Sequence, residues 1–157
     1  MNDKLNGISE NKLKHILGVA RTCQKLAEEF GLPPDAQHAC FVMGILHDIG
    51  YEYCEKTNIS NHSKISHSMI CEFERYKYYI TDAIKHHGDK YDNLTIFDEI
   101  LNTADLTTNY NGEPISIEDR IENIKQLYGE DSMHYKHAKE QADTIRKLRE
   151  QRNDSKL

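Results

Sequence analysis

Apolar residues recur at spacings of three and four along most of this chain, which is the period of an amphipathic α-helix. The first such run covers about residues 10–30, and its apolar face consists of Leu13, Ile16, Leu17, Ala20, Cys23, Leu26, Ala27 and Phe30. Gly31 ends this predicted helix, and the Pro33-Pro34-Asp35 sequence begins the next. Because residues 35–47 are apolar on most sides, we expect them to form a buried central helix.

The same pattern predicts further helices and few other elements. One begins near His62 or Ser63, and the others cover about 76–87, about 95–107, a segment capped by Ser116, and about 132–151. No segment shows the alternation typical of strands, and no internal repeat is present. We therefore predict an all-α helical bundle that forms a single domain over 1–157. About five core helices would lie within about 10–110, followed by a C-terminal helical extension over about 115–152 that ends in a polar surface helix with a frayed tail.

Composition and charge narrow the class of protein. The 157 residues are enough for one domain with a substantial core, and 29% charged against 38% hydrophobic residues is typical of a soluble globular chain. The formal net charge of −6 argues against an extended nucleic-acid surface. No apolar run approaches the roughly 20 residues that span a membrane. The first ten residues lack the apolar core of a signal peptide, so we expect a cytoplasmic location without membrane association.

Histidine and aspartate are placed where chemistry is expected. His47 and Asp48 end the most apolar predicted helix, and a buried carboxylate there is costly unless it is paired or bound to metal. His15 lies beside the apolar face of the first helix, and Asp105 interrupts the apolar fifth helix. Each residue taken alone could be a packing or capping residue, and together they suggest a metal site.

The other histidines leave alternatives open. His62 and His67 are five residues apart, so they point in different directions and at most one should reach the site. His86 and His87 end a helix before Gly88, where a cation is also favourable for purely electrostatic reasons. The four cysteines form no Cys-x-x-Cys pair, and we interpret them as buried thiols in a reducing compartment: Cys23, Cys40, Cys54 and Cys71.

The order of these residues resembles the HD-domain superfamily of metal-dependent phosphohydrolases. Residues 14–20 (Lys-His-Ile-Leu-Gly-Val-Ala) are similar to its first-histidine motif, and residues 44–50 (Gly-Ile-Leu-His-Asp-Ile-Gly) to its defining motif. Three later elements are also similar: His62-Ser-Lys-Ile-Ser, Lys85-His86-His87-Gly88 and Leu101-Asn-Thr-Ala-Asp105. The resemblance covers about residues 10–110 and implies an all-α HD-domain bundle.

The resemblance also implies a site with two divalent metal ions. One ion would be held by His15, His47, Asp48 and Asp105, and the second by a bridging Asp48 together with His62 and His87. Asp48 would be catalytic, and His86 would either give a proton to the leaving oxygen or act as an alternative ligand; His67 is the fallback ligand. Ligands of nitrogen and oxygen suit Fe, Mn or Zn better than Mg, with Ni or Co also compatible.

The implied activity is hydrolysis of a phosphate ester or anhydride of a nucleotide-like small molecule by a metal-activated hydroxide. Gly88-Asp89-Lys90 stands where the related dinucleoside-tetraphosphate hydrolases carry Thr-Thr-Gly, and no Gly-Tyr-Pro motif of cyclic-di-GMP phosphodiesterases follows His87. A diiron oxygenase-type protein and a non-catalytic nucleotide-sensing module are the alternatives. Lys14, Lys85 and Lys90 are candidates to contact phosphate. A homodimer is left open.

Overall fold

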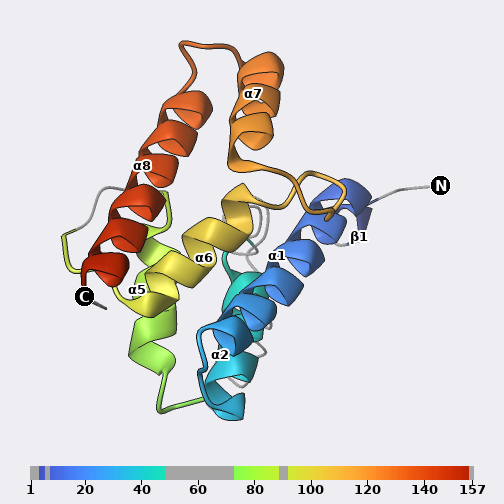
Figure 1. Ribbon diagram of the computed structural model, residues 1–157. Helices are drawn as coiled ribbons and strands as arrows, with labels where there is room; N and C mark the ends of the chain where they lie inside the picture. Colours follow the sequence, from blue (N-terminus) through green and yellow to red (C-terminus); the bar gives the residue numbers. More distant parts are fainter. Residues whose placement is uncertain (1–3, 6–7, 49–72, 89–91, 156–157) are drawn as a thin grey trace.

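The computed structural model describes residues 4–5, 8–48, 73–88 and 92–155, and these form a helical bundle (Figure 1). The prediction of an all-α fold is confirmed. Its helices are α1 (Glu10–Glu29), α2 (Pro34–Leu46), α5 (Lys77–His86), α6 (Ile96–Leu106), α7 (Ile117–Tyr128) and α8 (Met133–Asp154). Near the N-terminus, β1 (Lys4–Leu5) pairs antiparallel with β2 (Ile8–Ser9). The helix predicted to begin near His62 or Ser63 lies outside the described residues.

Side chains next to the helix ends explain where several helices begin. The hydroxyl of Ser9 accepts a hydrogen bond from the backbone N–H of Lys12 and thereby caps α1. Thr95 and Asp98 form a reciprocal capping box at the start of α6. The Ser116 hydroxyl accepts from the Asp119 N–H at 3.1 Å and caps α7, as the sequence predicts.

The main core lies between α1, α2, α5 and α6. Its buried apolar residues are Val19, Cys23, Ala27, Ala39, Cys40, Met43, Ile80, Ala83, Phe97, Ile100, Leu101 and Ala104. Helices α1 and α2 approach so closely that a Cβ on Gly44 would lie 2.4 Å from Cα of Ala20. Because the two helices run antiparallel after a short turn, this contact places the end of α2, one turn beyond Gly44, beside the first turns of α1.

A second apolar cluster joins α8 to α6 and α7. It consists of Leu106, Ile124, Ala138, Ala142 and Ile145. The expectation that α8 is only a polar surface helix is therefore wrong for one of its faces. Small alanines four residues apart let α8 pack closely even though most of its residues are polar. Near the C-terminal end of α8, Arg152 forms an ion pair with the buried Glu99. The guanidinium of Arg152 lies 4.5 Å from the centre of the Phe30 ring.

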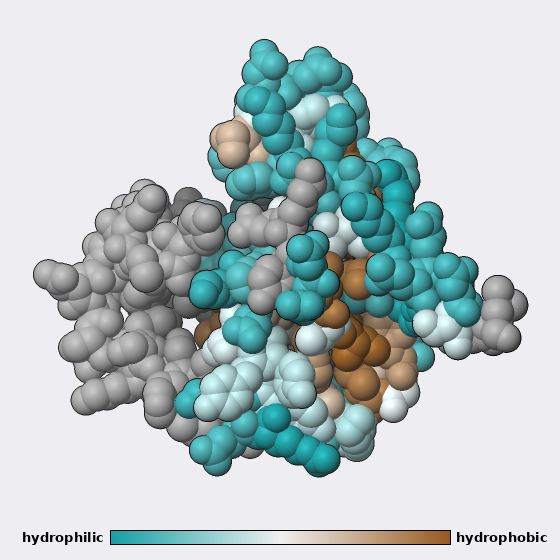
Figure 2. Space-filling model, turned by 90° about the vertical axis from the view of Figure 1, so that its left-hand side faces the viewer, coloured by the Kyte–Doolittle hydropathy of each residue, from teal (hydrophilic) through white to brown (hydrophobic). Residues whose placement is uncertain are grey.

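The outer surface near α7 and α8 is polar. Figure 2 shows the upper part of the molecule, where α7 and the start of α8 lie in Figure 1, as mostly hydrophilic. Among the described residues, no helix is both long enough and apolar enough to cross a membrane. The polar side chains of α8 thus face outward while its alanine face covers α6.

Candidate metal centre

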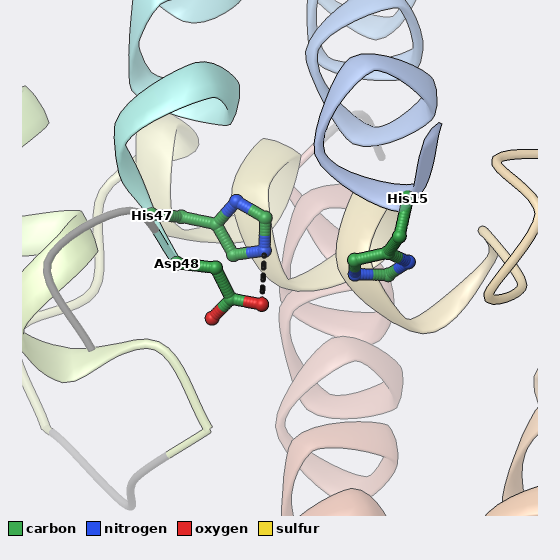
Figure 3. A group of neighbouring side chains, drawn as sticks. All are labelled: His15, His47 and Asp48. Atoms are coloured by element: carbon green, nitrogen blue, oxygen red, sulfur yellow. Dashed lines mark ion pairs between the residues drawn. The ribbon is translucent and has the colours of Figure 1, made fainter. Parts of the chain in front are cut away.

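Three histidines and two aspartates converge where several helices end. His47 directly follows α2, His87 directly follows α5, and His15 lies in the second turn of α1. Figure 3 shows His15 on α1 lying across from His47 and Asp48 at the end of α2. Donor atoms of these three residues all lie within 4.8 Å of one another. Asp105, near the end of α6, completes the group through its contacts with His15 and His47.

Each of the three histidines is oriented by a backbone carbonyl. Nδ1 of His15 lies 2.9 Å from the Asn109 carbonyl oxygen, and Nδ1 of His47 lies 2.7 Å from that of Gly44. His87 makes the same kind of contact with the carbonyl of Ile84. A carbonyl can only accept a hydrogen bond, so each Nδ1 must carry the donated proton. When these rings are neutral, each Nε2 presents a lone pair, which is the form of imidazole that binds metal.

The carboxylates lie against these Nε2 atoms. Oδ1 of Asp105 is 3.2 Å from Nε2 of His15 and 3.5 Å from Nε2 of His47. Oδ2 of Asp48 is 3.5 Å from the same His47 nitrogen, and its Oδ1 is 3.8 Å from Nε2 of His87. Although the two oxygens are near, Nε2 of His47 is buried and makes no hydrogen bond. A buried, unpaired ring nitrogen facing two carboxylates fits a divalent cation bound between them.

The electrostatic environment keeps both aspartates ionised. Burial alone would raise the pKa of Asp105, but the hydrogen bond from His15 and the positive charge of the nearby His47 and His15 rings hold it well below its usual range. Burial opposes ionisation of Asp48 as well. Its pKa is nevertheless lowered by the ion pair with His87 and by the charges of His47 and Lys12. The site therefore offers two carboxylates in the charged form that binds metal.

Lys12 is a member of this cluster that the sequence analysis did not single out. Its ammonium forms an ion pair with Oδ2 of Asp48, and both side chains are largely buried. Lys12 precedes His15 by three residues on α1, so the two share a helical face, and that spacing was the available signal. The lysines proposed from the sequence lie elsewhere: Lys14 is exposed and pairs with Glu10, Lys85 is exposed, and Lys90 lies outside the described residues.

An aromatic and cationic group borders the site beside His15. The ring of Tyr110 lies 6.3 Å from the His15 ring, and the guanidinium of Arg120 lies 4.4 Å from the centre of the Tyr110 ring. The Tyr110 hydroxyl donates to the Tyr128 hydroxyl at 3.2 Å, and burial followed by this contact raises the pKa of Tyr110 to about 12. Arg120 is 6% exposed, and its Nε and Nη1 make no hydrogen bond.

The structure thus brings together five of the six ligands predicted from the sequence: His15, His47, Asp48, His87 and Asp105. The sixth, His62, and the fallback His67 lie outside the described residues. His86 is the half-buried last residue of α5, and its function as a proton donor stays a prediction. Whether one or two ions bind likewise stays a prediction.

The metal-free protein should lose stability as the pH rises from about 6.5 to about 9. Burial alone would lower the pKa of His87, but the ion pair with Asp48, the charge of Asp105 and the Ile84 carbonyl together raise it to about 9. A raised pKa means that protonation stabilises the folded state fully below about 6.5 and that this contribution is lost as His87 deprotonates. We expect a decline of at most about 3 kcal/mol across this window.

Urea unfolding of the metal-free protein in EDTA, repeated from pH 6 to pH 9.5, measures this decline. In the His87→Gln variant the slope should largely disappear. His38→Gln, which changes an exposed histidine on α2, should retain it. An equal slope in the wild type and in His87→Gln would show that another group causes the decline.

Comparison with known proteins agrees with this geometry. The family model described as "HD domain" matches residues 13–124, which include His15, His47, Asp48, His87 and Asp105. No curated protein and no solved structure matches the chain. The family match covers most of the chain, and the converging histidines and aspartates lie within it. The chain therefore belongs to the HD-domain family, within the superfamily of metal-dependent phosphohydrolases.

Proposed function

We propose that this protein hydrolyses a phosphate ester or anhydride of a nucleotide-like small molecule at a site with two divalent metal ions. The observation that carries the proposal is the set of three carbonyl-oriented histidines whose Nε2 atoms face Asp48 and Asp105. His15, His47, Asp48 and Asp105 would hold one ion. Asp48, His87 and His62 would hold the other.

The ligand set favours iron, manganese or zinc, because imidazole nitrogen suits these ions better than it suits magnesium. When bound, such ions supply positive charge for a phosphate oxygen and lower the pKa of water. The protein supplies the orientation of the ligands and excludes competing water. Burial of His15 and His47, each 2% exposed, supports the latter contribution.

Lys12 and Tyr110 would contact the substrate on the side of α1. The Lys12 ammonium beside Asp48 provides a positive charge where a phosphate oxygen would approach the carboxylate-bound cation. The Tyr110 ring, next to His15, provides a flat apolar surface on which a base could pack. His86 would donate a proton to the leaving oxygen.

The test is to measure metal content and phosphate release on one anaerobically purified sample. Elemental analysis gives the metals per chain, and a panel of mononucleotides, dinucleoside polyphosphates and cyclic nucleotides reports hydrolysis. About two metals per chain with turnover on one phosphate class would support the proposal. Two irons with oxygen consumption and no phosphate release would contradict it in favour of oxygen chemistry. Nucleotide binding without any metal would contradict it in favour of a sensing module.

Replacing Lys12 with methionine should raise the KM for the phosphorylated substrate by roughly tenfold or more, since a charge-assisted hydrogen bond contributes about 1.5–3 kcal/mol. Lys14→Met is the matched control, because Lys14 is on the same helix but pairs with Glu10 at the surface. Steady-state kinetics on the substrate identified by the panel measures both variants. Equal KM values for the two variants would remove Lys12 from the substrate site.

A further inference from the structure

Helix α8 contributes a buried side chain to the neighbourhood of the metal centre. Gln141 is 5% exposed and lies on the buried face of α8. Its Nε2 donates to Oδ2 of Asp105 at 3.2 Å and to Oδ1 of Asn102 at 3.0 Å. Gln141 also lies beyond residues 13–124, the part of the chain that matches the HD family.

The orientation of this amide is determined by its neighbours. Nδ2 of Asn102 donates to the Asp98 carbonyl at 2.8 Å, which leaves Oδ1 of Asn102 as the acceptor for both Gln141 and the backbone N–H of Gly88, the latter at 2.9 Å. Because Asn102 presents an acceptor, Gln141 must present its NH₂ group, and that group has two hydrogens to donate. One hydrogen bond is donated to Asn102 and the other to Asp105.

The two oxygens of the Asp105 carboxylate make different contacts. Oδ2 accepts from Gln141, whereas Oδ1 faces Nε2 of His15 at 3.2 Å and Nε2 of His47 at 3.5 Å. A carboxylate on a short side chain can rotate, and a donor fixed to one oxygen prevents this rotation. Gly88 follows His87 directly, so the same Asn102 also anchors the turn that carries a third histidine.

We propose that Gln141 is a positioning residue that orients Asp105 toward the metal, and that Gln141 and Asn102 together couple α8 to the metal centre. This inference rests on the proposed metal site. It makes α8 a part of the functional unit although its outer face is polar. Gln141 touches neither substrate nor reacting atoms and acts through Asp105.

The test compares the affinity for Mn²⁺ and for Zn²⁺, each added alone to metal-free full-length protein, between the wild type, Gln141→Met and Gln151→Met. Methionine matches the length of glutamine without its hydrogen bonds, and Gln151 is an exposed glutamine on the same helix. We expect Gln141→Met to bind metal about 10–100-fold more weakly, as is typical when a residue that orients a ligand is removed. Gln151→Met should bind as the wild type does.

Competition with a chelator gives the affinities, and far-UV circular dichroism at the same temperature establishes that each variant is folded. If Gln141→Met does not fold, Gln141→Ala serves instead, because it leaves room for water beside Asp105 and should also bind metal more weakly. A lower melting temperature with unchanged metal affinity would overturn the inference, since Gln141 would then contribute only to packing. Failure of the wild type to bind either ion would instead overturn the proposed metal site itself.

Discussion

The Asp48→Ala variant is expected to contain no bound metal at the centre and to lose activity by more than about a thousandfold. Asp48 is the carboxylate that lies between His47 and His87, and its Oδ2 also accepts from Lys12. Removing it takes away the proposed bridge between the two ions. It also leaves the charged Lys12 without its partner, which further disfavours binding of a cation.

Two further variants accompany Asp48→Ala: one separates the charge of Asp48 from its size, and the other is a control. Asp48→Asn retains the size of the side chain and one acceptor oxygen but removes the negative charge, and we expect it to bind metal almost as poorly as Asp48→Ala. Asp82→Ala removes an exposed carboxylate from α5 and should leave metal content and activity unchanged. Elemental analysis of the three purified variants gives the metal bound per chain, which tests whether Asp48 is a ligand. A full complement of metal in Asp48→Ala would refute the assignment of Asp48 as a ligand.

Helical periodicity predicted the fold well because its signal is local. The apolar face of α1 and the nearly continuous apolar character of α2 place both helices within about one residue of their observed ends. The packing of α8 was harder to predict. Its buried residues are Ala138, Gln141, Ala142, Thr144 and Ile145, of which only Ile145 is large and apolar. Because the small and polar members of this face give little hydrophobic signal, the polar majority of the helix dominated the pattern. Close approach of helix backbones depends on such small residues.

The residues of the candidate site also differ in whether the sequence alone could identify them. Histidine and aspartate at the ends of apolar helices are visible in the sequence because burial of these residue types is costly. Gln141 and Tyr110 carry no such signal, since an isolated glutamine or tyrosine on a polar stretch is ordinary. Their places near Asp105 and His15 follow from how α8 and the turn after α6 pack. This packing joins Gln141 to Asp105, 36 positions away, and brings Asn109, the neighbour of Tyr110, to His15, 94 positions away.

That turn after α6 carries the second large expected effect, which is on stability. Gly112 has φ of +76°, and a Cβ added to it would lie 2.1 Å from the backbone oxygen of Lys14 on α1. We expect Gly112→Ala to lower the free energy of unfolding by about 2–4 kcal/mol, because it combines an unfavourable backbone conformation with a contact against rigid backbone. Metal affinity should fall too. The Asn109 carbonyl accepts from both the Gly112 N–H, at 3.1 Å, and Nδ1 of His15, so moving the turn disturbs the orientation of His15.

Gly31→Ala is the control that isolates the contact with α1. Gly31 has a similar φ of +72°, but a Cβ there would meet no atom within 4 Å. It should therefore show only the conformational cost, about 1 kcal/mol, without any change in metal affinity. Urea unfolding of both metal-free variants gives the two free energies, and their difference measures how tightly the turn is held against α1. Equal losses in the two variants would mean that the turn can move away from Lys14 at little cost, and the packing of this turn could then not be what holds His15 in place.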